Sequence, residues 1–294
     1  MANLLLVLLV NFFRLSAAEY SLIFHDDFTS GSIPDPKNWN IWDNKTHGDK
    51  EWQLYLADEV YLENGAMVIR TRVRDVQYGL KPYHFTSGWV DTSNKFESNY
   101  GKYSARIKLP VELPGLWPAY WLVQDQTKCW PMGGEVDILE AVGGLKNDSV
   151  FGTYHWGAAC GQDAWAKEHR NGDFPHPKGG HFSDDFHNFT VYWNRTVITW
   201  EVDGSAYVSR VAGQPQGLFI PSWNLFTIFN TALSFWGVPQ PPPRLGYPAF
   251  MRVDWVSVWK WSGPGGDTGD FEIPYNGTGL VPSVTTRLES HQKG

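Results

Sequence analysis

The sequence lacks two features that membrane-spanning and nucleic-acid-binding proteins need. Its apolar run near the N-terminus, Leu4 to Phe13, is too short to span a bilayer. Basic residues are in deficit, with 24 Lys and Arg against 31 Asp and Glu and a formal net charge of -7. A nucleic-acid-binding surface is normally basic. A polyanionic substrate is disfavoured more weakly, because local patches override net charge. We therefore expect neither a membrane nor a nucleic acid as a partner.

The N-terminal segment indicates secretion. The apolar run is followed by Ser16-Ala17-Ala18, small residues typical of a cleavage site. No basic residue precedes the run and Arg14 follows it, so a buried segment and an uncleaved anchor stay as alternatives. We expect residues 1–18 to be a signal peptide and the protein to be extracellular. Sequons, which would carry glycans in a eukaryotic source, start at Asn44, Asn147, Asn188, Asn194 and Asn276.

Long amphipathic helices, heptads and internal repeats are also absent, and short β-rich runs between Gly, Pro, Asn and Asp take their place. This succession of short β-rich runs and turn residues predicts an all-β sandwich over residues 19–261. The polar residues 262–294 are predicted to be a flexible extension. The expected strands are Ala66–Thr71, Gly101–Leu109, Glu135–Val142, Ser149–Trp156, Asn188–Trp193, Val197–Val202, Ser222–Asn230 and Met251–Trp259.

Cysteine is scarce, with Cys129 and Cys160 as the two examples. In a secreted chain such a pair favours one disulfide, and two buried thiols are the alternative. If Glu135–Val142 and Ser149–Trp156 form an antiparallel hairpin that turns near Gly144, the two cysteines fall opposite each other. The same register brings His155 close to Gly134 and Glu135, as a site residue or as a structural polar residue.

Tryptophan, by contrast, is abundant, with 16 residues in a chain of 294. A Trp side chain offers a flat apolar face and one polar N–H. Sugar rings stack on such faces, so the surplus favours a glycan-binding surface. Core packing is the competing explanation, and we expect it to account for about half of the tryptophans.

The segment Gly133 to Gly143 carries the predicted chemistry. In a strand, Glu135 and Asp137 point to one face. Strict alternation would bury Glu140, which is costly for an unpaired carboxylate. A β-bulge near Ile138 and Leu139 would return Glu140 to the acidic face. Three adjacent carboxylates raise one another's pKa values, which suits a glycosidase with one ionised and one protonated carboxyl. A Ca²⁺ site and a solvated strand face are the alternatives, and calcium would need more oxygen ligands from loops.

These residues resemble glycoside hydrolase family sixteen, in particular its laminarinase-like members. The resemblance rests on Glu135-x-Asp137-x-x-Glu140 and on the preceding Gly115-Leu-Trp-Pro-Ala-Tyr-Trp-Leu122. It extends to Glu51-x-Gln53-x-Tyr55, Tyr100 to Pro110 and Val253 to Trp259, in order along the chain. It implies a β-jelly-roll sandwich of two antiparallel sheets with a concave glycan-binding cleft. By position, Glu135 would be the nucleophile, Glu140 the acid/base and Asp137 the residue that tunes both.

The spacing of the motif narrows the expected function. The resemblance associates two residues between Asp137 and Glu140 with β-1,3-glucanases and with some galactan-cleaving enzymes. We therefore predict a retaining endo-β-1,3-glucanase that acts as a monomer on β-glucan and needs no organic cofactor. A cell-wall β-glucan transglycosylase, a β-1,3(4)-glucanase, a galactanase and a non-catalytic β-glucan recognition protein are the alternatives. The recognition proteins usually lack the acids that are present here.

Further residues are candidates for substrate binding or for a metal. The resemblance suggests that Glu51, Gln53 and Asn230 bond sugar hydroxyls, that Arg106 orients a hydroxyl or a carboxylate, and that His155 has a site role. It also suggests a structural calcium at Asp254, with Asp26 or Asp27 as partners. The predicted stacking residues, each with core packing as its alternative, are Trp89, Trp117, Trp121, Trp130, Trp156 and Trp236. Pro118 makes an unbroken strand from Trp117 to Trp121 doubtful.

Overall fold

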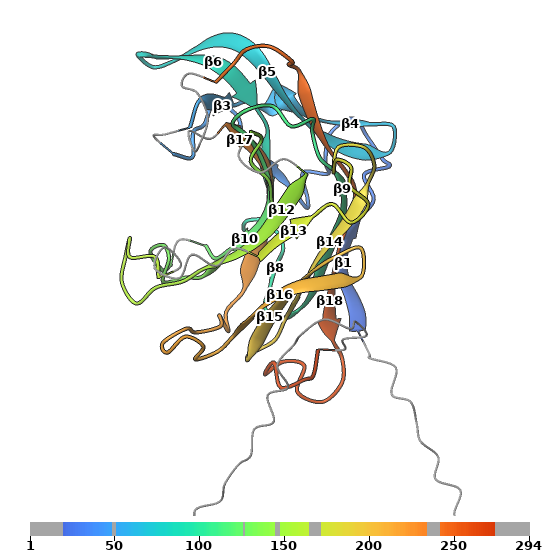
Figure 1. The fold of residues 1–294 in the computed structure, drawn as a ribbon, viewed down its shortest axis with the longest axis vertical. Coiled ribbons are helices and arrows are strands. Elements are labelled where there is room, and N and C mark those ends of the chain that lie inside the picture. Colours follow the sequence, from blue (N-terminus) through green and yellow to red (C-terminus); the bar gives the residue numbers. More distant parts are fainter. Residues whose placement is uncertain are drawn as a thin grey trace, which may run out of the picture.

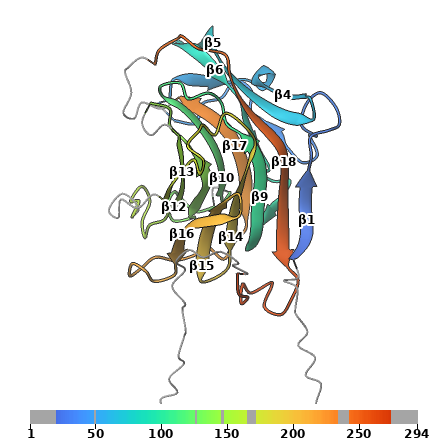
Figure 2. The ribbon, with the colours of Figure 1, turned by 45° about the vertical axis from the view of Figure 1, so that its right-hand side comes forward.

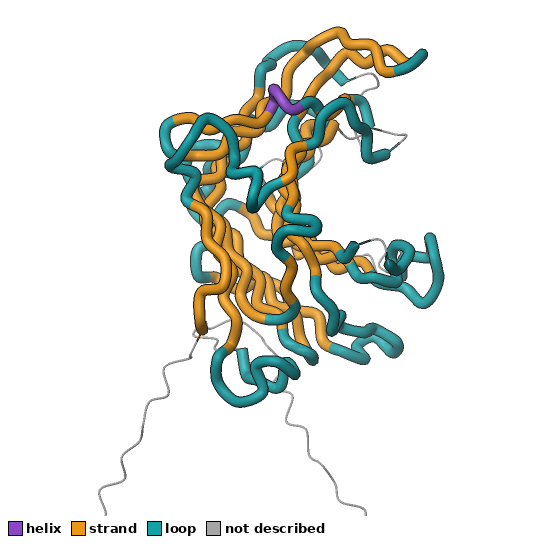
Figure 3. Tube along the Cα trace, turned by 180° about the vertical axis from the view of Figure 1, so that it is seen from behind, coloured by secondary structure: helices purple, strands orange, loops and turns teal. Residues whose placement is uncertain are grey.

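The computed structural model describes residues 20–48, 51–125, 127–144, 148–164, 172–233 and 242–273. Within these ranges regular structure is almost entirely strand, with one short 3₁₀ turn at Ala57–Glu59 (Figure 3). No helix in this part of the chain is long and apolar enough to cross a membrane. The predicted all-β class is confirmed.

The strands form two curved, stacked sheets (Figures 1 and 2). Neighbouring strands are antiparallel except for β3 and β6, which run parallel. The ten-stranded sheet has the order β16 (Ser205–Val211), β15 (Val197–Val202), β14 (His187–Trp193), β9 (Gly101–Lys108), β18 (Ala249–Trp261), β5 (Ala66–Tyr78), β6 (Lys81–Ser87) and β3 (Gln53–Tyr55), with β1 (Tyr20–Asp26) beside β18 and β4 (Val60–Glu63) beside β5.

The eight-stranded sheet carries the acidic motif on its third strand. Its order is β13 (Gly172–Pro175), β12 (Ser149–His155), β11 (Glu135–Glu140), β10 (Leu116–Val123), β17 (Leu225–Leu233), β7 (Trp89–Asp91) and β2 (Asn40–Ile41), with β8 (Glu97–Ser98) also paired to β17.

The main hydrophobic core lies between the two sheets. Tyr103 and Phe189 of the ten-stranded sheet and Tyr120 and Phe229 of the eight-stranded sheet are fully buried in it. Tyr120 stacks on Phe229 with ring centroids 4.5 Å apart. Burial of each large apolar side chain contributes about 1.5–3 kcal/mol. This core fixes the eight-stranded sheet, so its opposite face is free to carry polar groups.

Pro118 does not interrupt β10, contrary to the doubt raised by the sequence. The Pro118 carbonyl accepts a hydrogen bond from Ala141, so its missing N–H faces the same side of the strand. The bond that Pro118 cannot donate would reach Ala141, which lies just past the end of β11 at Glu140, so the pairing within β11 is kept. Trp117 and Trp121 can therefore lie on one face of a continuous strand.

The predicted C-terminal boundary needs a correction. Residues 262–273 are not a loose extension, because they pack on the sandwich. Phe271 is buried and stacks on Trp261, and its carbonyl accepts a hydrogen bond from Asn194. Residues 1–18 of the predicted signal peptide, and the tail from 274 onward, lie outside the described residues.

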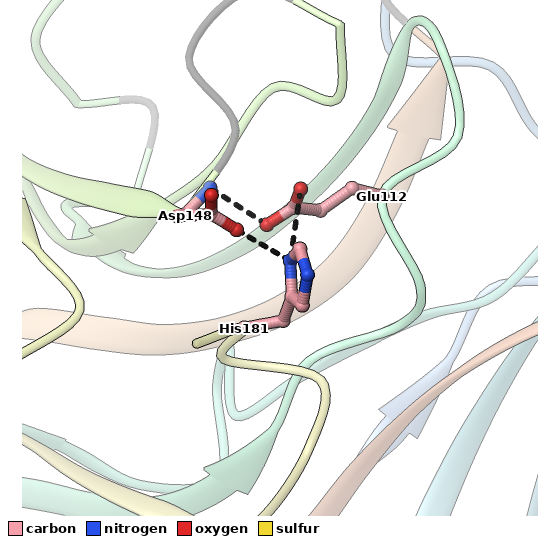
Figure 4. A group of neighbouring side chains, drawn as sticks. All are labelled: Glu112, Asp148 and His181. Atoms are coloured by element: carbon pink, nitrogen blue, oxygen red, sulfur yellow. Dashed lines mark hydrogen bonds and ion pairs between the residues drawn. The ribbon is translucent and has the colours of Figure 1, made fainter. Parts of the chain in front are cut away.

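Three loops meet at the end of the sandwich beyond Glu140, through Glu112, Asp148 and His181 (Figure 4). Glu112 accepts a hydrogen bond from the Asp148 backbone N–H at 2.8 Å. The His181 imidazole lies against both carboxylates. The Asp148 and His181 side chains are about half exposed. We interpret this group as a set of structural side-chain contacts that joins the β9–β10, β11–β12 and β13–β14 loops.

Candidate active site

A β-bulge in β11 aligns the three carboxylates. Against β10, Leu139 pairs with Tyr120 but Asp137 already pairs with Trp121, so Ile138 is the extra residue. The register against β12 shifts at the same place, between Asp137 and Glu140. Glu135, Asp137 and Glu140 consequently line one hollow, as the sequence predicted. Val136, Ile138 and Leu139 are buried in the core.

Two indole N–H groups hold the outer carboxylates of the motif. Trp130 donates to Glu135 Oε2 at 3.1 Å. Trp117 donates to Glu140 Oε1 at 2.8 Å, and Thr153 donates to the other oxygen of Glu140 at 3.3 Å. Both carboxylates therefore have fixed orientations before any substrate arrives.

His155 faces the remaining carboxylate oxygens from β12. Its Nε2 lies 3.3 Å from Asp137 Oδ2 and 3.8 Å from Glu135 Oε1. Its Nδ1 lies 2.7 Å from Asp163 Oδ2. The register places His155 directly opposite Glu135, one residue from the predicted pairing with Gly134.

Burial and mutual repulsion favour protonation in this cluster. Burial, and then the charge of Asp137, raise the pKa of Glu135 to about 7 and raise the pKa of Glu140 well above its usual value. Burial also raises the pKa of Asp137, against the hydrogen bond from His155. Burial alone would lower the pKa of His155, but Asp137 and Asp163 raise it well above the usual value. The site thus combines an imidazole that favours its protonated form with carboxyls that hold a proton more tightly than exposed ones do.

The acidic face opens into a groove with two adjoining parts. A hollow of about 420 Å³ surrounds the carboxylates, and a wider one of about 1330 Å³ continues from it. Both parts include His47, Trp89, Trp121 and Glu135. The wider part is also lined by Trp42, Val123, Gln124, Lys128, Cys129, Trp130, Gly133, Gly134, Phe226 and Ile228. Its shape and aromatic lining suit an extended glycan chain.

Trp130 is the exposed aromatic of the groove, with 45% of its surface accessible. Trp89 and Trp121 are nearly buried, and they form the wall through edge-to-face contact at 5.4 Å between centroids. Trp42 stacks on Trp89 at 4.2 Å. Trp117 lines the hollow beside Glu140. Four of the six predicted stacking residues therefore border the groove.

Glu51, Gln53 and Asn230 belong to one hydrogen-bond network beside the hollow. Gln53 donates to Glu51 at 2.6 Å, and its carbonyl oxygen accepts from the Leu233 backbone. Asn230 accepts from Trp121 at 2.8 Å. Glu51 and Asn230 line the hollow itself. Gln53 is 1% exposed, so it positions Glu51 and is not available to a sugar, which corrects the prediction for Gln53.

Two further predictions fail on position. Arg106 lies on β9 of the other sheet, where it forms an ion pair with Asp254 at 2.6 Å. It therefore cannot reach a sugar in the groove. The same guanidinium takes the place of a cation at Asp254, while Asp26 is bonded to Trp39 and Asp27 to Thr29. These residues do not fit a calcium ion.

Trp156 is a core residue and not a stacking platform. It is 8% exposed and packs edge-to-face against Phe219 within the main core. Trp236 lies outside the described residues.

Several residues of the site carry no local sequence signal. His47 lies in an irregular loop, contacts Glu51 at 3.3 Å and lines both parts of the groove. Asp163 follows the β11–β12 hairpin, and its carboxylate lies 2.7 Å from His155 Nδ1. Trp200 of the ten-stranded sheet donates to the Asp137 carbonyl at 2.7 Å and so supports β11 from below. The Trp200 contact joins residues 63 positions apart, whereas the His47 and Asp163 contacts are local but lie in irregular segments.

The predicted disulfide between Cys129 and Cys160 is confirmed, with Cα atoms 5.4 Å apart. It links the loop before β11 to the loop after β12. Trp130 and Asp163 lie on these two loops, so the bridge holds the residue that bonds to Glu135 and the residue that bonds to His155 Nδ1.

A comparison with known protein families agrees with this geometry. The family described as Glycosyl hydrolases family 16 matches residues 43–256. The chain belongs to this family. Its relatives include "Glucan endo-1,3-beta-glucosidase A1" from Niallia circulans, which is 30% identical over 83% of this chain. The chain spans 38% of the length of that relative.

Two further family 16 relatives are similar over nearly their whole length. "Beta-glucanase" from Rhodothermus marinus is 29% identical, over 83% of this chain and 87% of that protein. The catalytic domain of an endo-1,3-beta-glucanase (laminarinase) from Thermotoga petrophila RKU-1 superposes with a TM-score of 0.71 and 28% identity. That match covers 84% of this chain and all of the Thermotoga domain. The predicted two-sheet jelly roll is thereby confirmed.

Proposed function

We propose that this family 16 protein is a retaining endo-β-1,3-glucanase. The observation that carries the proposal is the bulged strand β11, which presents Glu135, Asp137 and Glu140 together at the floor of an open aromatic groove. The hollow around the carboxylates continues into a wider part of the groove. A groove that extends beyond the reacting bond can hold the interior of a polymer, which supports endo cleavage. Relatives that bear the names of 1,3-β-glucanases support β-1,3-glucan as substrate.

The chemistry is a double displacement. The protonated Glu140 donates its proton to the glycosidic oxygen while Glu135 attacks the anomeric carbon, so that the C–O bond to the leaving sugar breaks as the glycosyl–Glu135 bond forms. Glu140, now ionised, removes a proton from water, and the water oxygen displaces Glu135. Asp137 separates the two glutamates and its charge keeps the proton on Glu140. These steps use side chains alone.

The groove offers complementary roles for its other residues. Trp130 presents an exposed ring for stacking next to Glu135, and Trp89 and Trp121 continue the apolar wall. Glu51 and Asn230 supply acceptors and donors for sugar hydroxyls. The acidic balance of the chain, with a net charge of -7, favours a neutral glucan over a sulfated galactan.

Secretion and glycosylation form the second part of the proposal. The disulfide supports an oxidising compartment, in agreement with the proposed signal peptide at residues 1–18. Asn44 and Asn188 are exposed and suit glycans, whereas Asn194 is 4% exposed and its side chain is bonded to Phe271 and Thr196. We expect the protein to act as a monomer, because the groove is complete within one chain.

Product analysis on laminarin, lichenan and agarose tests the proposal. We expect laminarin to give a mixture of β-1,3-oligosaccharides of several lengths from the first minutes. Glu135→Gln and Glu140→Gln should each reduce the rate about 10²–10⁴-fold while leaving the circular dichroism spectrum unchanged. Preferential cleavage of lichenan or agarose would identify that polysaccharide, and not β-1,3-glucan, as the substrate. Longer products than the starting chains would instead identify a transglycosylase.

A further inference from the structure

The carboxylate of Asp163 lies behind His155, on the side away from the catalytic acids. Its Oδ2 accepts a hydrogen bond from His155 Nδ1 at 2.7 Å. The Asp163 side chain is 10% exposed and the His155 side chain 15%. A short charge-assisted bond at a site shielded from water is about twice as strong as a neutral one. This contact therefore fixes both the orientation and the charge of the imidazole.

The loop that carries Asp163 is held in place from both sides. Cys160 is bonded to Cys129 three residues before Asp163. Ala164, the next residue, donates its backbone N–H to the Trp156 carbonyl at 2.8 Å. Gly157 lies so close to the Gln162 carbonyl that an added Cβ would be 2.1 Å from it. Asp163 is thus a fixed group and not a surface acid that happens to reach His155.

The opposite side of His155 faces acids that compete for its proton. Asp137 and Glu135 of β11 lie 3.3 Å and 3.8 Å from Nε2. Glu140 lies beyond Asp137 on the same strand, and His47 faces Glu135 from across the groove. A proton that moves from Nε2 of His155 to Oε1 of Glu135 leaves the net charge of the cluster unchanged. However, it converts the nucleophile into an unreactive neutral acid.

We infer that Asp163 is a positioning residue that holds His155 as an imidazolium and thereby keeps Glu135 ionised for attack. This inference rests on the proposed function. An anionic Asp163 stabilises the pair of imidazolium and Glu135 carboxylate over the pair of neutral imidazole and protonated Glu135. The elevated pKa of His155 agrees with this arrangement. The same carboxylate–histidine pairing stabilises the imidazolium in serine hydrolases, where the histidine acts on another nucleophile.

The test is Asp163→Asn, which keeps an oxygen acceptor for Nδ1 but removes the charge. Each unit by which the pKa of His155 falls reduces the ratio of the imidazolium–carboxylate pair to the imidazole–carboxylic acid pair about tenfold. We expect kcat for glucan cleavage to fall about tenfold with KM nearly unchanged. The acidic limb of the pH–rate profile should move to higher pH, because Glu135 loses its neighbouring cation. Asp163→Glu, which restores the charge, should recover part of the rate.

Asp203→Asn is the matched control. Asp203 also accepts from a histidine, at 2.6 Å from His187 Nδ1, but it lies in the β15–β16 turn of the other sheet. This variant should leave kcat and the pH profile unaltered. Equal losses of kcat in the two variants would show that Asp163 contributes only to the stability of the fold, which would overturn the inference.

Two measurements separate this inference from the proposed function. Nitrogen-15 NMR of His155 reports its charge without any substrate, and it should show an imidazolium at pH 7 in the wild type and a larger neutral share in Asp163→Asn. An unchanged charge state would overturn the inference even if glucan is cleaved. In a Glu140→Ala background with an activated aryl glucoside, which needs no acid, the Asp163→Asn defect should persist. Its disappearance would show that Asp163 acts through Glu140 and would overturn the inference.

Discussion

The two glutamates proposed as catalytic are distinguished by the groups around them, and their roles can be tested one residue at a time. Glu135 lies 3.8 Å from the imidazolium of His155, which favours its ionised form, whereas Glu140 is bonded to Trp117 and Thr153, which carry no charge. A charged nucleophile and a neutral acid are what retention requires. The assignment therefore predicts both the stereochemistry and the outcome of chemical rescue.

With an activated β-glucosyl donor, Glu135→Ala plus azide should give the α-glycosyl azide, because azide enters on the face that the nucleophile has vacated. Glu140→Ala plus azide should give the β-azide, since the covalent intermediate still forms and azide needs no general base. Proton NMR identifies both products, and it should show the β-anomer as the first product of the wild type. Swapped azides would reverse the two roles, and an initial α-anomer would exclude Glu135 as nucleophile.

Burial of the acidic cluster predicts a pH-dependent cost in stability. Since the pKa of Glu135 is raised from 4.5 to about 7, the folded state binds a proton more tightly than the unfolded state between these values. Stability is highest below about pH 4.5 with respect to this group, and it falls as the pH rises through 7. Glu135→Gln removes the charge, so it should raise Tm at pH 8. We expect roughly 2–4 °C for each kcal/mol by which the free energy of unfolding increases.

Thermal unfolding of wild type and Glu135→Gln at pH 4.5 and pH 8 measures this effect. The difference in Tm between the two proteins should disappear at the lower pH, where the side chain at position 135 is uncharged in both folded proteins. If the Tm difference were the same at the two pH values, its cause would be packing and not the buried charge.

At the scale of single elements, alternation along a strand explains both the successes and the errors of sequence reasoning. The bulge in β11 was predictable, because burying Glu140 without it would be too costly. Alternation also contradicts a joint site role for His155 and the residue that follows it at the end of β12. With His155 facing the groove, Trp156 must face the core. Arg106 was misplaced for a different reason, since periodicity shows which residues share a face but not which sheet carries them.

Loop residues of the site were beyond sequence reasoning. His47 and Asp163 lie in irregular segments, where no periodicity indicates direction. Their positions depend on packing and on the disulfide. The register of the hairpin located the Cys129–Cys160 bridge, but the position of Asp163 beside His155 follows only once the loop is folded.

The contact between the two sheets beneath β11 yields a prediction for Gly152. An added Cβ would lie 2.3 Å from Cδ1 of Trp200, the indole that bonds to the Asp137 carbonyl. Gly152→Ala should therefore displace Trp200 and destabilise the fold by about 1–3 kcal/mol. Urea denaturation measures the loss. We expect the rate on glucan to fall as well, because β11 loses its support.

Gly152→Ala combined with Trp200→Leu provides the control. The smaller side chain makes room for the new methyl group, so the double variant should be more stable than the sum of the two single losses implies. Strict additivity would show that the two residues do not collide.

For the molecule as a whole, the eight-stranded sheet separates two tasks. One face packs against the ten-stranded sheet, which fixes strand positions, and the other face carries the groove. The catalytic strand has partners on both sides, β10 and β12, and is supported from below by Trp200. What the sandwich does not fix are the loops at the ends of these strands, and there the chain uses side-chain contacts and its disulfide.

Removal of the Cys129–Cys160 bridge should therefore affect activity through the two loops that it joins. The bridge closes a sequence separation of 31 residues, so the Cys129→Ser/Cys160→Ser variant should lose about 2–4 kcal/mol of stability, measured by urea denaturation. Trp130, next to Cys129, would hold Glu135 less firmly, and Asp163, three residues after Cys160, would hold His155 less firmly. We expect kcat to fall at temperatures well below unfolding, with the acidic limb of the pH profile displaced in the direction of Asp163→Asn. If the variant kept full kcat and an unaltered pH profile at 25 °C despite its lower stability, the bridge would stabilise the fold without positioning the site.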